Sequence, residues 1–180
     1  GRINEKREDG FLTDKYKYEG YAWYYKSVDV SAIPENSRVE LFLERTRITK
    51  LWVNGSFVGG FDSLCTPHVY DVTDHIIHGK LDICVMVSNV GYATSGGHMT
   101  SQDTQTNWNG ITGDISLIIS DKTGIRNIQA YPDGKNRSVR LIFGLDGIGS
   151  ADVNVWGVSS DCKTVDNKSY RVTSDSPEIV

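Results

Sequence analysis

The stretch LWVNGSFVGG, residues 51–60, decides the fold expected for this chain. Two short runs rich in apolar and small residues flank the pair Asn54-Gly55. A two-residue type I′ turn needs positive φ at both central positions, and Asn-Gly adopts these conformations more readily than most other pairs. The stretch therefore predicts an antiparallel β-hairpin with its turn at Asn54-Gly55.

Strand patterns of the same kind recur on both sides of this hairpin. In residues 39–44 (VELFLE) apolar side chains stand at every second position, which indicates a half-buried strand with a partly apolar outer face. The most helix-like window, residues 72–79, lasts only a turn or two. The runs rich in β-branched and aromatic residues are 21–30, 38–45, 48–55 and 81–89. Turn sequences separate these runs. These features predict an all-β protein, a sandwich or a barrel.

Large aromatic residues fall inside several of the expected strands. We expect Trp23, Trp52 and Trp156 in the core, because large aromatic side chains in strands are usually buried. The alternation of side chains along a strand puts Tyr24 on the face opposite Trp23 and Tyr25. For Tyr24 we expect packing against a neighbouring strand.

The composition divides the chain into three parts. Residues 1–19 are charged and without period, which indicates a lead-in arm, and residues 20–121 form a first sandwich domain. A turn sequence at 121–124 separates it from residues 125–180, which show about four further strand patterns. An immunoglobulin-like sandwich has roughly seven strands. We therefore expect 125–180 to be the N-terminal part of such a domain, truncated at residue 180.

Composition and charge narrow the classes of function. The 180 residues carry a net charge of −4 without a basic stripe, which argues against nucleic acid as a partner. We expect no membrane partner, because the chain has no apolar run long enough to span a bilayer. Its three cysteines, Cys65, Cys84 and Cys162, show no metal-ligand spacing and are expected to be buried or half-buried thiols.

From the sequence we expect no metal site, no cofactor and no catalytic group. His75 and His78 lack the flanking cysteines or carboxylates of a zinc site. The glycines of 144–150 join two strands and open no helix, unlike a phosphate-binding loop. Neither a Ser–His–Asp set, a Cys–His pair nor a pair of carboxylates stands out.

A long polar loop is the candidate functional region. Residues 90–113 form an excursion longer than the roughly 12–15 residues beyond which loops tend to be functional or disordered. Amide and carboxylate side chains surround one indole there, namely Asp103, Gln105, Asn107, Trp108 and Asn109. In one interpretation the Trp108 side chain packs into the end of the sandwich, and the amides form hydrogen bonds with backbone groups of the loop. In the other, the amides bind sugar hydroxyls and the indole stacks on the apolar face of a pyranose.

Four blocks of the chain, in order, resemble glycoside hydrolase family 2, the β-galactosidase and β-glucuronidase group. The resemblance covers roughly residues 18–120. The blocks are YEGYAWYYKSVDV, LWVNGSFVGGFDSLCTPHVYDVTDHI, LDICVMVSN and TNWNGITGDISLII. The matching residues of the first block are Gly20, Ala22, Trp23 and Tyr24. Those of the second block are Trp52, Val53, Asn54, Gly55, Val58, Gly59, Pro67, Asp71 and Thr73. The third block matches at Asn89, and the fourth at Trp108, Gly110, Ile111, Gly113 and Ile115. Residues 61–68 depart from the Gly-Gly-Tyr of many members, so ligand contacts do not transfer to them.

The resemblance implies a jelly-roll sugar-binding domain followed by the start of an immunoglobulin-like domain. In the family two glutamates of a later (β/α)₈ barrel hydrolyse O-glycosidic bonds with retention, which sets their carboxylates roughly 5–5.5 Å apart. That barrel needs about 250 residues and is absent here, so this chain should not hydrolyse anything by itself. The expected partners are a β-glycoside carbohydrate and the missing barrel.

In the family the Trp-containing loop approaches the active site. The resemblance thus makes Asp103, Gln105, Asn107, Trp108 and Asn109 candidate substrate-binding residues. It is also compatible with a periplasmic or secreted parent, and cytoplasmic members are expected too.

Two other classes of function stay open. An autonomous carbohydrate-binding module would carry a cluster of exposed aromatic side chains on one strand face. A structural or protein-interaction sandwich without sugar affinity would show exposed strand edges or a large apolar patch.

Overall fold

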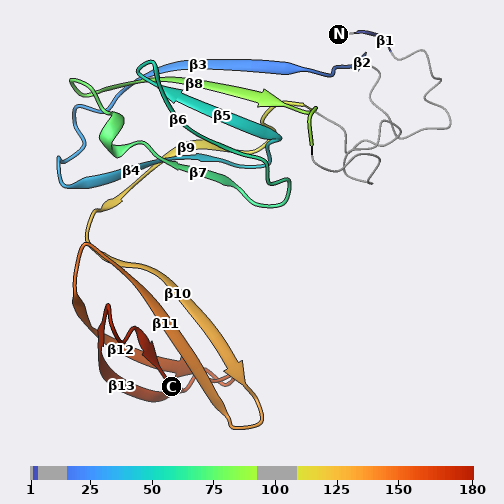
Figure 1. The fold of residues 1–180 in the computed structure, drawn as a ribbon. Coiled ribbons are helices and arrows are strands. Elements are labelled where there is room, and N and C mark those ends of the chain that lie inside the picture. Colours follow the sequence, from blue (N-terminus) through green and yellow to red (C-terminus); the bar gives the residue numbers. More distant parts are fainter. Residues whose placement is uncertain (1, 4–15, 93–108) are drawn as a thin grey trace, which may run out of the picture. The chain divides into compact units, whose positions relative to one another are not determined.

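The computed structural model describes residues 2–3, 16–92 and 109–180 (Figure 1). The chain divides into two compact units, Gly1–Ser120 and Asp121–Val180, and each is described by itself. The described residues form antiparallel β-strands and one short 3₁₀ helix, η2 (Thr73–His75), which confirms the all-β prediction. In this part of the chain no helix has the length and apolar character needed to cross a membrane.

Two facing sheets make up most of the first unit (Figure 1). A four-stranded sheet has the order β3-β8-β5-β6, and a three-stranded sheet has the order β7-β4-β9. A further pair joins β1 (Arg2–Ile3) to β2 (Tyr16–Lys17). The bounds of the other strands are β3 Tyr21–Asp29, β4 Ser37–Leu43, β5 Ile48–Val53, β6 Ser56–Phe61, β7 His68–Asp71, β8 Lys80–Ser88 and β9 Ile115–Asp121.

The core of the first unit lies between these sheets and follows the alternation predicted for β4. Val39 and Leu43 are completely buried, and Leu41 is 2% exposed. Opposite them, β5 and β8 contribute a matching apolar set, which is Leu51, Val53, Leu81, Ile83, Val85 and Val87. Each fully buried aliphatic side chain contributes about 1.5–3 kcal/mol relative to an exposed one. This core holds the two sheets together.

The predicted hairpin is confirmed. β5 pairs antiparallel with β6, and Val53 stands opposite Ser56 across the turn. Asn54 and Gly55 have φ values of 49° and 80°, as a type I′ turn requires. The Asn54 amide also donates to the carbonyl of His75 at 2.7 Å, and its oxygen accepts from the N–H of Asp82 at 2.9 Å. Asn54 therefore shapes the turn and ties it to η2 and β8.

The prediction that the strand tryptophans are buried is wrong for Trp23 and Trp156. Trp23 is 52% exposed and Trp156 is 57% exposed, while Trp52 is half-buried on the outer face of its sheet. β3 carries aromatic side chains on both faces, so a period of two predicts alternation without telling which face turns inward. The cysteines differ from expectation as well, because Cys65 and Cys162 are exposed and only Cys84 is half-buried.

The second unit contains a smaller core. One sheet has the order β10-β11-β14, and a separate pair joins β12 and β13. Phe143, Val153 and Val172 form the buried centre. At its surface the Arg140 guanidinium lies 4.4 Å from the centroid of the Tyr131 ring. The strand bounds are β10 Gly124–Asp133, β11 Ser138–Asp146, β12 Ser150–Val158, β13 Thr164–Thr173 and β14 Glu178–Ile179.

Candidate functional site

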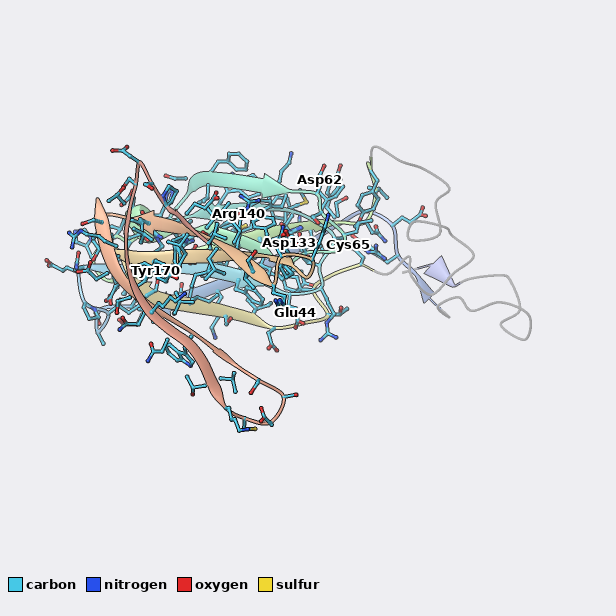
Figure 2. All side chains as sticks on the ribbon, turned by 90° about the horizontal axis from the view of Figure 1, so that it is seen from below. Glu44, Asp62, Cys65, Asp133, Arg140 and Tyr170 are labelled. Atoms are coloured by element: carbon cyan, nitrogen blue, oxygen red, sulfur yellow. The ribbon has the colours of Figure 1, made fainter. Side chains whose placement is uncertain are left out.

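The candidate site lies at the end of the first unit where β4 and β8 end and β9 begins. We call this the loop end, because the chain leaves it at Tyr92 and returns to it at Asn109. Figure 2 shows Glu44, Asp62 and Cys65 toward this end. The register agrees, since Leu43 at the end of β4 pairs with His68 at the start of β7.

Two asparagines hold the backbone at this end. The Asn89 oxygen accepts from the N–H of Gly20 at 3.1 Å, and the Asn89 amide donates to the carbonyl of Tyr18 at 2.7 Å. The Asn109 amide donates to the carbonyl of Gly20 at 3.1 Å, and the Asn109 oxygen accepts from the N–H of Gly110 at 2.8 Å. The peptide groups of Gly20 are thus clamped from two segments far apart in the sequence.

The segment 110–114 is fixed against the end of β4. The N–H of Thr112 donates to the carbonyl of Arg45 at 3.0 Å, and Thr46 forms a β-bridge with Ile111. Glu44 binds the same segment through its carboxylate, which accepts from the N–H of Asp114 at 3.1 Å. A Cβ on Gly113 would lie 2.7 Å from the carbonyl oxygen of Glu44, so only glycine fits there without displacement of backbone.

The buried Arg47 and the half-buried Tyr92 interact where the chain leaves this end. Arg47 is only 1% exposed. Burial lowers the pKa of Arg47, and interaction with Tyr92 opposes that shift. Burial raises the pKa of Tyr92, and Arg47 opposes this in turn. Because an arginine stays protonated in proteins, a buried cation lies beside Tyr92, near the start of the long excursion.

His68 holds the loop that precedes β7. Its Nδ1 lies 2.6 Å from the Thr49 hydroxyl, and its Nε2 lies 2.8 Å from the carbonyl oxygen of Ser63. A carbonyl can only accept, so Nε2 carries the proton and Nδ1 accepts from Thr49. Burial is the main cause that lowers the pKa of His68. The neutral imidazole thus joins β5 to residues 62–67, where the chain departs from the pattern of family 2.

The five predicted site residues divide into two groups. Asp103, Gln105, Asn107 and Trp108 lie outside the described residues. Asn109 lies within them, half-buried, and both polar atoms of its side chain bind backbone groups.

Sequence reasoning singled out neither Arg47 nor the structural role of His68. The burial of Arg47 could have been predicted from its position just before β5, because it continues the alternation of the buried residues Thr49 and Leu51. In the described part of the chain, His, Cys, Asp and Glu side chains form no group of three or more that could hold a metal ion.

Comparison with known proteins agrees with this architecture. The protein named "Putative beta-glucuronidase" of Formosa agariphila is 33% identical over 79 residues, which are 43% of this chain and 10% of that protein. A β-glycosidase from Bacteroides vulgatus superposes with a TM-score of 0.67 at 19% identity, covering 94% of this chain and 22% of that chain. Bacteroides uniformis β-glucuronidase 3 gives a TM-score of 0.67 at 18% identity, covering 87% of this chain and 22% of that chain.

The chain therefore spans between a tenth and about a quarter of the length of these relatives. At such low identities the superpositions show a shared fold. The family model "Glycosyl hydrolases family 2, sugar binding domain" matches residues 12–120. The chain belongs to this family, the sugar-binding domain of the family 2 glycosyl hydrolases.

Proposed function

We propose that this chain is the non-catalytic N-terminal region of a family 2 glycosidase, supporting a catalytic barrel and helping to shape its substrate pocket. In this proposal the first unit is a jelly-roll sugar-binding domain, and residues 125–180 are the N-terminal part of an immunoglobulin-like domain. The facing sheets of the first unit and the antiparallel strands of the second are compatible with both assignments.

The observation that carries the proposal is the fixed segment 109–114. Asn109, Thr112 and Asp114 all make hydrogen bonds to residues distant in the sequence. The polar residues before it are therefore joined to a rigid base, which suits side chains that must meet a substrate in one geometry. We propose that Asp103, Gln105, Asn107 and Trp108 contribute side chains to that substrate pocket, and that Asn109 contributes by holding the backbone at its base.

Two assays of the 180-residue chain test this role. The chain should not hydrolyse 4-nitrophenyl β-galactoside or β-glucuronide, because a barrel of about 250 residues carries the family's chemistry. In a heteronuclear NMR titration, galactose and glucuronic acid should shift the amides of 98–113 with millimolar or weaker affinity, since most of the pocket is missing. Steady hydrolysis, or a micromolar dissociation constant for either sugar, would contradict the proposal.

A substitution in the longer enzyme tests the same role directly. Asn107→Ala should raise KM for the glycoside more than it lowers kcat, if this side chain binds substrate in the ground state and the transition state alike. Asn136→Ala in the second unit is the matched control, because it removes an amide of the same type at an exposed position. Equal kinetics for both variants would argue for a purely structural loop.

A further inference from the structure

The outer face of the four-stranded sheet carries a row of aromatic side chains. The ring of Trp23 on β3 contacts that of Trp52 on β5, which in turn contacts the ring of Phe57 on β6. The ring centroids of Trp23 and Trp52 lie 5.7 Å apart, and those of Trp52 and Phe57 lie 5.2 Å apart. Trp23 is 52% exposed and Phe57 is 56% exposed. The ring planes are tilted by 38° and 54°, so part of the ring surface stays open to solvent.

A small residue opens a groove within this row. Cys84 of β8 stands between Tyr25 and Trp52 in the register of the three strands. Because the cysteine side chain is short and its neighbours are large, the sheet surface is hollowed there. The resulting open groove has a volume of about 680 Å³, within the range of small-molecule binding sites. Tyr25 and Cys84 stand opposite each other in the register of β3 and β8, and interaction with Cys84 is the main cause that raises the pKa of Tyr25.

The groove also contains polar groups. Ser27 and Asp82 line it, and the Ser27 hydroxyl donates to the Asp82 carboxylate. Lys26 borders the same groove, but its register partner is Ile83, so its side chain belongs to the other face of β3 from Tyr25 and Ser27. Ile83 also lines the groove, but its side chain belongs to the core and is only 8% exposed. The exposed side chains of the groove are therefore aromatic or polar.

This combination matches the chemistry of a saccharide. The C–H face of a pyranose packs on an aromatic ring, and its hydroxyls need hydrogen-bond partners such as carboxylate oxygens. Open ring faces and the carboxylate of Asp82 lie in one groove here. The Asp82 carboxylate lies in the groove, whereas the phosphates of a nucleic acid would need an excess of cations there.

We propose that the outer face of the sheet β3-β8-β5-β6 holds a saccharide-binding groove, in which Trp23 and Trp52 stack on pyranose rings and Asp82 accepts hydrogen bonds from sugar hydroxyls. The groove runs along the outer face of the sheet from Trp23, near the start of β3, to Gly55 of the hairpin turn. The loop end lies beyond Trp23, where β8 finishes at Ser88. The proposal does not depend on the substrate role proposed for residues 103–109. It would let this region hold a glycan chain apart from the site where a bond is cleaved.

Calorimetric titrations of the 180-residue chain with cellopentaose, xylopentaose and laminaripentaose test the groove. At least one of these neutral oligosaccharides should bind saturably. Trp52→Ala should weaken that binding about tenfold or more, on the order expected for loss of a stacked ring. Trp156→Ala is the matched control, because Trp156 is 57% exposed but belongs to the second unit, and it should leave the affinity unchanged.

Two further variants keep the test independent of folding. Cys84→Leu should fill the groove floor and reduce binding while the thermal unfolding temperature is maintained. Asp82→Ala should weaken binding through the lost acceptor. Absence of binding by all three oligosaccharides would overturn the proposal. So would equal loss of binding in the Trp52 and Trp156 variants, or a concentration-dependent dimer that Trp52→Ala converts to monomer without any sugar binding.

A result confined to the loop end would separate the two proposals. If the oligosaccharides shift only amides of 98–113 and Cys84→Leu binds normally, the groove proposal fails and the proposed role of the loop stands. If binding depends on Trp52 and Asp82 while monosaccharides leave 98–113 unchanged, the groove stands and the role of the loop loses its support.

Discussion

At the loop end of the first unit, polar side chains bind backbone, whereas on the outer face of the sheet β3-β8-β5-β6, aromatic side chains remain exposed. Asn89 and Asn109 direct their amides at the peptide groups around Gly20. Trp23 and Phe57 instead leave about half of their surface open. The first arrangement fixes the chain but leaves those amides few remaining donors and acceptors for a ligand. The second arrangement contributes little to the stability of the fold and leaves an aromatic surface that a ligand can contact. Substitutions should therefore alter stability at the loop end and binding at the groove.

The largest expected effect is on stability at the loop end. Gly113→Ala should lower the free energy of unfolding by about 2–3 kcal/mol, because the added Cβ meets backbone that cannot move freely. The nearest backbone atom, the carbonyl oxygen of Glu44, would lie 2.7 Å away. Urea unfolding followed by circular dichroism measures the change. Gly134→Ala is the control, since a Cβ there meets nothing within 4 Å and should change stability by less than about 0.5 kcal/mol. Equal stability of the two variants would contradict the fixed segment.

Acid should destabilise the first unit through His68. Burial lowers the pKa of His68 in the folded state. The unfolded state then binds a proton near pH 6.5 that the folded state does not. The stabilisation is complete above that pH and is lost as pH falls toward the lower pKa of the folded state. One such group changes stability by at most about 1.4 kcal/mol per pH unit.

Urea titrations between pH 7.5 and 5 measure this dependence. His68→Gln, which keeps hydrogen-bonding capacity but does not titrate, should flatten the profile relative to the unsubstituted chain. An identical pH slope in both proteins would show that His68 does not change its protonation on unfolding.

A smaller effect is expected for the asparagine that closes the polar loop. Asn109→Ala removes the hydrogen bonds to Gly20 and Gly110 and should cost about 1 kcal/mol of stability. Amide hydrogen exchange at Gly110 should quicken in parallel. Asn154→Ala, on an exposed strand position of the second unit, serves as control. Unchanged exchange at Gly110 would mean that Asn109 does not hold the segment.

The smallest effect on stability is expected in the groove. Trp23→Ala should lower the free energy of unfolding by about 0.5–1 kcal/mol, because the half-exposed Trp23 ring loses its contact with Trp52. The same variant should lose most of its oligosaccharide affinity. A large loss of stability in the urea titration would instead place Trp23 in the framework of the sheet and weaken the comparison drawn above.

Local rules were enough to predict much of the fold. The turn at Asn54-Gly55 and the alternation in β4 both follow from the geometry of a few neighbouring residues. The inward face of β3 could not be predicted in this way, because Trp23 and Tyr24 point to opposite sides and are both large. Which one faces inward depends on the partner sheet, and that information lies in distant residues.

The candidate sites were predicted less completely, also for physical reasons. The buried state of Arg47 and the role of His68 arise from contacts between segments that are far apart in the sequence, such as Thr49 with His68. The groove needs three strands in one register, with Cys84 between Tyr25 and Trp52. A strand pattern read along the chain contains no information on that register.

One two-dimensional NMR titration tests the central claim most directly, that the loop end and the groove have separate roles. The indole N–H signals of the four tryptophans and the amides of 98–113 are followed while xylopentaose or cellopentaose is added. The account predicts saturable shifts at Trp23 and Trp52, no shift at Trp156, and at most weak, non-saturating shifts in 98–113. Saturable shifts confined to 98–113, with Trp23 and Trp52 unchanged, would contradict it.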